Sequence, residues 1–294
     1  MTPATAKLPQ ALKGVRILSL ALNLPGPAAL MRCRQMGARC IKLEPPSGDP
    51  MGHYNQRAYA DLHEGVKPLT ADLKTHAGQK ALHRELAKTD VLLTSFRPSA
   101  IEKLGLNWKK LHRLYPALSQ IAIVGAPGAR AEEPGHDLTY LADNGLVTGL
   151  ELPPTLYADM GGSLMVSEAV LQATLNQRLK GKGVFMEIAL SDAAAYLALP
   201  RQWGLTLPGG SVGGAHAGYR VYPCKDGRVA VAALEPHFAA SLCAAAGIEI
   251  AGGMKAMFAP ATHQAIAAFL LTQTRRQLDK LAAAKDIPLY TLTD

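Results

Sequence analysis

Short apolar runs alternate with helical patterns over the first two hundred residues of the chain. The runs with the length of buried strands are residues 15–21, 40–43, 91–94, 118–124 and 185–190. The stretches between them whose apolar spacing or proline and glycine boundaries predict helices are 25–36, 77–87, 162–180 and 191–200. Strands that alternate with helices form parallel sheets with right-handed crossovers. The pattern therefore predicts an α/β fold with a Rossmann-like parallel sheet and helices on both of its faces.

The pattern changes after residue 201. Residues 202–218 are rich in glycine and proline, which is typical of a linker. Beyond them the apolar runs 219–222 and 229–234 flank an Asp-Gly pair, a strong signal for a hairpin, and three helical patterns follow. We therefore expect a large Rossmann-like domain over 1–201, a linker over 202–218 and a small α+β domain over 219–294.

The composition agrees with a soluble enzyme and is sufficient for a full hydrophobic core. The chain has 294 residues, of which 48% are hydrophobic and 18% charged. No apolar run is long enough to span a bilayer, and residues 1–10 lack the apolar core of a signal peptide, so we expect a cytoplasmic protein without a membrane partner. The cysteines lack metal-ligand spacing and are predicted to be buried thiols: Cys33, Cys40, Cys224 and Cys243. No metal site is expected.

The net charge of +8 raises the question of a nucleic-acid partner. The basic residues are dispersed, and aromatic residues make up only 5% of the chain, so no platform for base stacking is visible. We expect no nucleic-acid partner. An anionic small molecule explains the sign of the charge, and so does a role in solubility.

Three titratable residues lie where a strand or loop gives way to a predicted helix. His136 precedes a helical stretch, where the positive end of the helix disfavours imidazolium and leaves a neutral base. Asp159 precedes the helix at 162–180, which is expected to be buried, and the same field favours its carboxylate. Glu235 ends an apolar run and precedes Pro236, a residue suited to a first helical turn. Two bases and a carboxylate that tunes the histidine make a coherent set.

Each of the three residues also has an ordinary structural interpretation. An aspartate before a helix is most often an N-cap, which is the alternative for Asp159. A lone histidine such as His136 is usually structural or exposed to solvent. Glu235 fits equally well as a solvated residue at the end of a strand.

Short motifs that belong together run in order along nearly the whole chain. They are Leu12-Lys13-Gly14-Val15-Arg16, Pro25-Gly26-Pro27, Ile41-Lys42-Leu43-Glu44-Pro45-Pro46, Gly48-Asp49-Pro50, Ala71-Asp72-Leu73-Lys74, Phe96-Arg97-Pro98, Gly135-His136-Asp137, Ala158-Asp159 and Leu234-Glu235-Pro236. In this order they resemble the family III CoA-transferases of the CaiB/BaiF type, which include the α-methylacyl-CoA racemases. The ordered set is far more specific than any one motif.

The resemblance implies a role for each of the three titratable residues. Asp159 matches the carboxylate that carries the acyl or CoA group in transferases and acts as a base in racemases. His136 matches the second base of the racemases, and Glu235 matches the glutamate that supports it. Because a transferase needs only the aspartate, the histidine and glutamate bring the chain closest to the racemases.

The resemblance also implies a CoA thioester as substrate, with no permanently bound cofactor, and a homodimer. The residues it assigns to CoA binding are Leu24, Pro25, Lys42, Lys67, Ser95, Phe96, Arg97 and Lys103. The chain departs from the family at residues 64–68, where relatives have a more basic stretch, and at Pro45, where they have arginine. It stops soon after residues 287–290, so the return segment of the family is expected to be absent.

Three hypotheses about function follow. The first is a racemase of 2-methylacyl-CoA thioesters, in which His136 and Asp159 flank the α-carbon and exchange its proton, while backbone N–H groups near residues 159–161 hold the enolate oxygen. The second is a CoA-transferase, in which Asp159 attacks the thioester. The third is an acyl-CoA binder without turnover.

Overall fold

The computed structural model describes residues 9–249 and 253–293, and it divides the chain into two compact units, residues 1–198 and 199–294. Residues 1–8, which carry most of the amino-terminal stretch considered above, lie outside the described ranges. Within those ranges, no helix is both long and apolar enough to cross a membrane.

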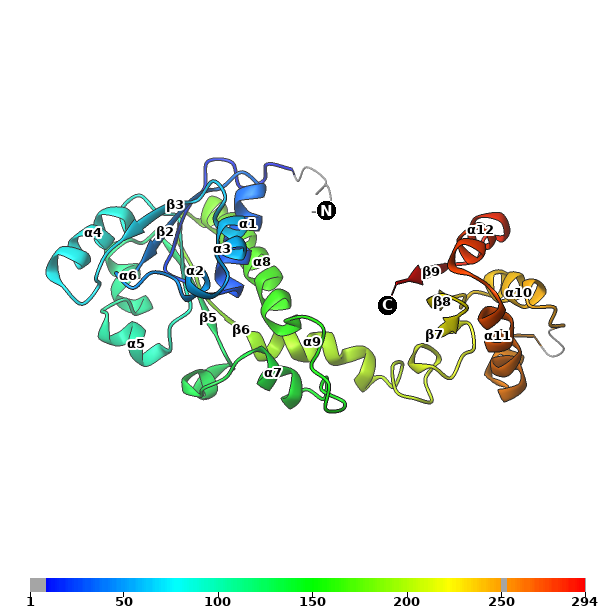
Figure 1. The fold of residues 1–294 in the computed structure, drawn as a ribbon. Helices are drawn as coiled ribbons and strands as arrows, with labels where there is room; N and C mark the ends of the chain where they lie inside the picture. The colour runs from blue at the N-terminus through cyan, green and yellow to red at the C-terminus, as the bar shows by residue number, and fades with distance from the viewer. Residues whose placement is uncertain (1–8, 250–252, 294) are drawn as a thin grey trace. The chain divides into compact units, whose positions relative to one another are not determined.

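The first unit is built on a parallel sheet in the strand order β3-β2-β1-β4-β5-β6 (Figure 1). The strands are β1 (Arg16–Ser19), β2 (Arg39–Glu44), β3 (Lys67–Thr70), β4 (Val91–Thr94), β5 (Ser119–Val124) and β6 (Phe185–Ala189). Every neighbouring pair is parallel, as the alternation of strand and helix predicts. The predicted α/β class with a Rossmann-like sheet is confirmed.

Helices cover both faces of this sheet. They are α1 (Pro25–Gln35), α2 (Pro50–Tyr54), α3 (Gln56–His63), α4 (His76–Leu86), α5 (Pro98–Lys103), α6 (Trp108–Leu114), α7 (Asp137–Asp143), α8 (Tyr157–Lys180) and α9 (Leu190–Gln202), with a 3₁₀ turn at Gly128–Glu132. Ile17 and Leu93 pack into one core with α1 and α8, whereas their neighbours Leu18 and Leu92 pack into another with α4 and α6. Successive strand residues thus enter opposite cores, which is why these strands read as continuous apolar runs.

The sequence missed the edge strand β3, the helices α2 and α3 and a strand at Leu289–Leu292, and it mispredicted one helix. Strand β3 contains Pro68 and is largely exposed, so it carries no apolar run for a pattern to detect. Helix α8 begins at Tyr157 instead of residue 162 and runs through its glycine pair. The helix is also buried on one side only, since Val166 and Val170 enter the core while its exposed leucines do not.

The second unit is a small α+β unit with an antiparallel sheet in the order β7-β8-β9. Its elements are β7 (Tyr219–Cys224), β8 (Gly227–Ala232), α10 (Pro236–Ala245), α11 (Pro260–Thr272), α12 (Arg275–Lys285) and β9 (Leu289–Leu292), with 3₁₀ turns at Ser211–Gly213 and Gly253–Phe258. Cys224 pairs with Gly227 across a two-residue turn, so the predicted hairpin is confirmed. The four cysteines are free and buried, also as predicted. Burial raises the pKa of Cys40 to about 12, so that thiol is inert.

A glycine at the start of α1 tests the packing beside the sheet. A Cβ at Gly26 would collide with the Cβ of Ala21 and lie 3.5 Å from Ile123 Cδ1. We expect Gly26→Ala to lower the free energy of unfolding by about 1–3 kcal/mol, measured by chemical denaturation, because both neighbours are in the core. Gly149→Ala is the control, since a Cβ there meets nothing within 4 Å. Equal stability of the two variants would contradict the close approach at Gly26.

Candidate active site

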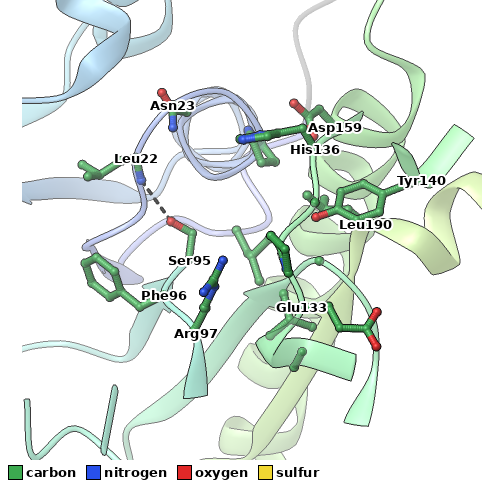
Figure 2. Close-up of a pocket in the computed structure, with 17 residues that line it drawn as sticks. Leu22, Asn23, Ser95, Phe96, Arg97, Glu133, His136, Tyr140, Asp159 and Leu190 are labelled. Atoms are coloured by element: carbon green, nitrogen blue, oxygen red, sulfur yellow. Dashed lines mark hydrogen bonds between the residues drawn. The ribbon is translucent and has the colours of Figure 1, made fainter. Parts of the chain in front are cut away.

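A cavity of about 310 Å³ lies at the carboxyl ends of the strands of the first unit (Figure 2). Its wall is formed by residues that directly follow four strands: Leu22, Asn23 and Pro25 after β1, Ser95, Phe96 and Arg97 after β4, Gly125 after β5, and Leu190 after β6. β1 and β4 are neighbours at the point where the strand order reverses. Ligands of open α/β sheets bind at this point, so the cavity is the expected place for a substrate.

The structure brings two of the three predicted catalytic residues into this cavity. His136 is the N-cap residue of α7, as expected, and its backbone N–H donates to Thr139 Oγ1 at 3.1 Å. Asp159 is the third residue of α8 and is mostly buried, whereas His136 is exposed. Both side chains line the cavity (Figure 2). Asp159 is therefore part of the helix rather than the cap ahead of it.

A third acidic residue holds the start of α8. The carboxylate of Asp137 is buried, and its Oδ1 accepts a hydrogen bond of 2.9 Å from the backbone N–H of Asp159. This bond satisfies an N–H that has no partner within the first turn of the helix. It also ties α8 to α7, so that His136 and Asp159 are held by neighbouring helix starts. Asp137 stands in the Gly-His-Asp motif but was not among the predicted site residues.

The environment of Asp159 favours its protonated form more than water does. Burial, and then the negative charge of Asp137, raise the pKa of Asp159 to about 6, while His136 acts in the opposite direction. A group with such a pKa takes up and releases a proton close to neutral pH, which suits a general acid and base. The raised pKa thus fits proton transfer at this side chain.

Two of the backbone N–H groups near Asp159 are not free to form the oxyanion hole that the sequence suggested. The N–H of Asp159 is bonded to Asp137, and the N–H of Met160 donates to the carbonyl of Leu156 at 3.0 Å. The reason is that the helix already begins at Tyr157, so these groups lie inside its first turn. Two of the proposed donors are thus engaged within the protein.

Tyr140 is a polar residue of the cavity that the sequence analysis did not single out. It lies one turn after His136 on α7 and lines the cavity half-buried. Burial and the charge of Asp159 raise the pKa of its hydroxyl, while Arg97 lowers it. A Cβ at Gly125 or Gly135 would collide with this side chain, so both glycines are needed for its position. The spacing of four residues from His136 was the signal available in the sequence.

Half of the residues assigned to CoA binding line the cavity. They are Pro25, Ser95, Phe96 and Arg97. The Ser95 hydroxyl accepts a bond of 3.2 Å from the N–H of Leu22, which joins the ends of β4 and β1 (Figure 2). Leu24 packs beside Met51 and Leu62 in a small core next to the cavity.

The three lysines assigned to CoA binding lie elsewhere. Lys67 is exposed on the edge strand β3, and Lys103 is exposed at the end of α5. Lys42 is fully buried in β2, where its ammonium is paired with Asp49 and Glu44. It has no solvent-facing side for a phosphate, because the sheet and the loop after β2 enclose it.

Glu235 belongs to the second unit. It is the N-cap residue of α10, with Pro236 at the first helical position, as the sequence predicts. Its side chain is exposed and does not cap the helix, so the carboxylate remains available for another partner.

Comparison with known proteins identifies the class of protein. A family model described as CoA-transferase family III matches residues 12–294. The chain is 30% identical over 246 residues to the α-methylacyl-CoA racemase of Homo sapiens, which covers 78% of this chain and 63% of that protein. It is 33% identical over 206 residues to the succinyl-CoA–D-citramalate CoA-transferase of Chloroflexus aurantiacus, which covers 64% of this chain and 51% of that protein. The chain therefore belongs to CoA-transferase family III, in which these relatives are enzymes of two kinds.

Solved structures share the fold. A CAIB/BAIF family protein from Brucella suis matches with a TM-score of 0.80 at 23% identity, over 96% of this chain and 84% of that one. A hypothetical protein from Mycobacterium tuberculosis matches with a TM-score of 0.81 at 24% identity, over 95% of this chain and 82% of that one. The matches to the two curated enzymes above span only 51% and 63% of their length.

The raised pKa of Asp159 predicts a pH-dependent gain in stability for Asp159→Asn. The pKa rises from 3.8 to about 6 on folding, so the native carboxyl costs no stability below pH 4 and its cost grows to a plateau above pH 6. The amide carries no charge. We therefore expect the free energy of unfolding of the variant to be up to about 3 kcal/mol higher than that of the parent at pH 8, and equal to it near pH 4.

Urea denaturation at several pH values measures this difference. Asp61→Asn, at an exposed carboxylate of α3, is the control and should show no such trend. A difference between Asp159→Asn and the parent that stays constant from pH 4 to pH 8 would contradict the raised pKa.

Proposed function

We propose that the protein racemises the α-carbon of a 2-methylacyl-CoA thioester by two-base proton transfer. The observation that carries the proposal is the pair of bases, His136 and Asp159, in one cavity at the switch point of the sheet. The similarity to α-methylacyl-CoA racemases of Homo sapiens and Mus musculus supports it.

The chemistry needs two groups with matched proton affinities. The proton α to a thioester carbonyl is weakly acidic, so a base must remove it while a conjugate acid returns one to the other face. Asp159, with a pKa of about 6, serves in either direction near neutral pH. We assign His136 as its counterpart, because an imidazole can both accept and donate a proton.

The enolate oxygen needs a donor or a positive charge. In place of the engaged N–H groups of α8, we assign this role to Arg97 and the Tyr140 hydroxyl. Both side chains line the cavity, and the charges of Arg97 and Asp159 both act on the Tyr140 hydroxyl. A charged donor in a partly enclosed site stabilises a developing oxyanion more than water does.

Glu235 keeps the role that the family resemblance gives it, the support of His136. A carboxylate bonded to one ring nitrogen fixes the tautomer and stabilises the imidazolium that forms after proton abstraction. Its place as an exposed N-cap residue, with a side chain that does not cap its own helix, supports this assignment.

A CoA-transferase reaction is the second candidate, because transferases are among the relatives. In that reaction the Asp159 carboxylate attacks the thioester, CoA thiolate leaves and a mixed anhydride forms. The thiolate then attacks the aspartyl carbonyl, which releases the donor carboxylate and leaves an aspartyl-CoA thioester, and an acceptor carboxylate takes up CoA by the reverse of these steps. Hydroxylamine trapping of an adduct on Asp159 would favour the transferase.

A homodimer is the form in which we expect the protein to act. Large apolar side chains of α8 and α9 are exposed in the single chain: Leu164, Leu175, Leu179, Tyr196 and Leu197. The sheet of the second unit likewise exposes Val221 and Tyr290. Several exposed large apolar side chains on the same elements indicate an interaction surface.

Deuterium incorporation tests the reaction. In heavy water, the parent protein should exchange the α-proton of a 2-methylacyl-CoA in both epimers. His136→Ala and Asp159→Ala should each lose exchange by about 100-fold or more, and each should retain a preference for one epimer, because one base remains. Glu168→Gln, at an exposed carboxylate of α8, is the control.

The pairing of His136 with Glu235 is tested in the same assay. His136→Ala combined with Glu235→Ala should be little worse than His136→Ala alone, since residues that act as a unit are not additive. Full exchange in Asp159→Ala would contradict both enzymatic reactions. Tight CoA binding by the parent without exchange or transfer would instead identify a binder.

The oligomeric state is tested by light scattering. We expect a mass of twice the chain at concentrations where the protein is active. Leu175→Glu together with Leu179→Glu should shift the mass to that of a single chain, because charges would replace the exposed apolar side chains of α8. A monomeric parent with full activity would contradict the dimer.

A further inference from the structure

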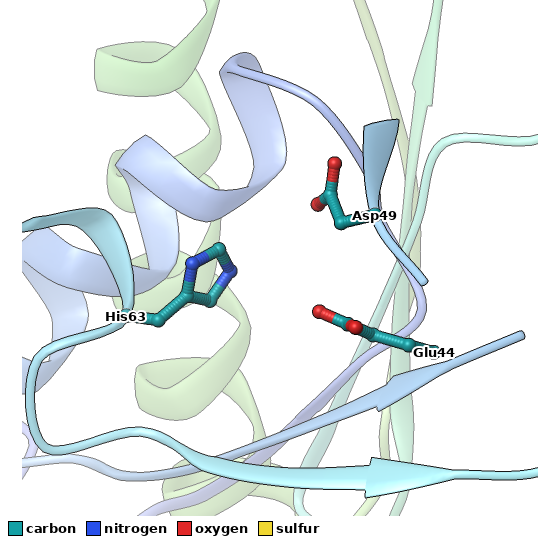
Figure 3. Close-up of side chains that lie close together, drawn as sticks. All are labelled: Glu44, Asp49 and His63. Carbon is teal, nitrogen blue, oxygen red and sulfur yellow. The ribbon is translucent and has the colours of Figure 1, made fainter. Parts of the chain in front are cut away.

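Three side chains beside the cavity are arranged like the ligands of a metal ion. Glu44, Asp49 and His63 each offer an oxygen or nitrogen atom, and these atoms all lie within 4.8 Å of one another. Figure 3 shows the three side chains converging on one space, from β2, from the loop that follows it and from the end of α3. Two carboxylates and an imidazole are a set that Mn²⁺ and Zn²⁺ bind.

The ammonium of Lys42 fills that space. It is paired with Asp49, lies 3.3 Å from Glu44 Oε1 and 2.8 Å from His63 Nε2, and the lysine is fully buried. His63 Nδ1 lies 2.7 Å from the carbonyl of Tyr59 and must donate to it, which leaves Nε2 as an acceptor. Asp49 and His63 thus accept hydrogen bonds from the ammonium, and Glu44 is its second ion-pair partner.

Tyr59 completes the enclosure of this charge. Its hydroxyl donates a hydrogen bond of 2.8 Å to Glu44 Oε1. Its ring lies tilted against the ring of His63, with a centroid distance of 4.2 Å, and the ring centroid is 5.5 Å from the Lys42 ammonium. A cation in such a site is stabilised by every group around it.

Asp49 connects the buried Lys42 ammonium to the wall of the cavity. Its two oxygens accept the backbone N–H of Asn23 at 3.0 and 3.2 Å, and Oδ1 also accepts the N–H of Met51 at 2.9 Å. Asn23 lines the cavity and has a φ of 65°, the left-handed conformation that costs a residue with a side chain. The Tyr54 hydroxyl binds the Asn23 side chain at 3.3 Å. Asn23 is thus held on both sides.

We propose that the Lys42 ammonium is a built-in cation that takes the place of a metal ion, and that through Asp49 it holds Asn23 in its left-handed conformation at the cavity wall. Lys42 and Asp49 are then positioning residues for the site. The effect on turnover rests on the proposed function, whereas the replacement of a metal ion does not.

Removal of the lysine creates the first test. Lys42→Ala leaves two buried carboxylates and a histidine without their cation, so the variant should bind one Mn²⁺ or Zn²⁺ per chain and gain thermal stability from it. The parent protein and Lys80→Ala, at an exposed lysine of α4, should gain nothing. Lys42→Ala with Asp49→Asn should lose the metal-dependent gain, because a ligand is missing.

Calorimetry with each metal alone, followed by melting curves, gives the outcome. Lys42→Met, which keeps more of the volume, repeats the test if the alanine variant folds only with metal, a result that also supports the proposal. Absence of metal binding in both variants, or equal binding by the parent, would overturn the assignment of Lys42 as a metal substitute.

A second test addresses Asn23. Glycine adopts a φ of 65° without strain, so Asn23→Gly should make the cavity wall less dependent on Asp49. We expect Lys42→Met to lower kcat/KM for α-proton exchange by about 100-fold in the parent, and by about 10-fold or less in the Asn23→Gly background. Asp286→Gly, at another non-glycine residue with positive φ, is the control and should give no rescue.

The two tests fail separately. Metal binding by Lys42→Ala without rescue by Asn23→Gly would support the cation and overturn the link to the cavity. If the parent shows no exchange, the affinity of these variants for CoA replaces kcat/KM as the readout. The proposed function then fails, while the cation and the link to Asn23 are still decided.

Discussion

The candidate site depends on one hydrogen bond between two acidic residues. The buried carboxylate of Asp137 accepts the N–H of Asp159, so an aspartate caps the helix that carries another aspartate. This bond fixes the start of α8 beside α7, and with it the positions of Asp159 and His136. It also brings a negative charge close to the Asp159 carboxyl, and that charge raises its pKa together with burial. Asp137 thus contributes to the position of Asp159 and, after burial, to its proton affinity.

A second buried aspartate has a parallel role at another part of the same wall. Asp49 accepts the N–H groups of Asn23 and Met51, as Asp137 accepts that of Asp159. The two aspartates differ in their compensation. Asp49 forms an ion pair with Lys42. Asp137 instead lies near the carboxyl of Asp159 and makes the ionisation of Asp159 less favourable. The Lys42–Asp49 pair therefore holds the backbone of Asn23, whereas Asp137 raises the pKa of Asp159.

Much of the fold could be predicted because its signal is local. The strands with residues such as Ile17 and Leu92 have apolar side chains on both faces, so their runs are visible in the sequence. Strand β3 has no such signal, since it is an edge strand that contains Pro68. The start of α8 was mispredicted because the backbone N–H of Asp159, in its first turn, is satisfied by Asp137, which is 22 positions away.

The catalytic candidates were accessible from the sequence for a different reason. His136 and Asp159 stand in short motifs, and the resemblance assigned their roles before any geometry was known. Lys42 shows the limit of that reasoning. The resemblance assigned Lys42 to CoA binding. Its position in the strand β2 buries it, however, and its charge is explained by its contacts with Asp49 and His63. Burial of a charge depends on contacts between distant residues, which no local pattern contains.

The pKa of Asp159 can be compared with what each candidate reaction, proton transfer and acyl transfer, requires of this carboxyl. With a pKa of about 6, about nine-tenths of this carboxyl is ionised at pH 7, which satisfies a nucleophile as well as a base. The remaining protonated fraction matters only to a reaction in which Asp159 must also return a proton. A nucleophile also gains from burial, because the ionised form attacks more readily as its basicity rises and its hydration decreases, and most of the carboxyl is still ionised at pH 7. A group that acts in both directions gains from it, since a pKa near the working pH makes removal and return of the proton comparable in cost. The raised pKa of Asp159 therefore suits both candidate reactions, and hydroxylamine trapping of an adduct on Asp159 separates them.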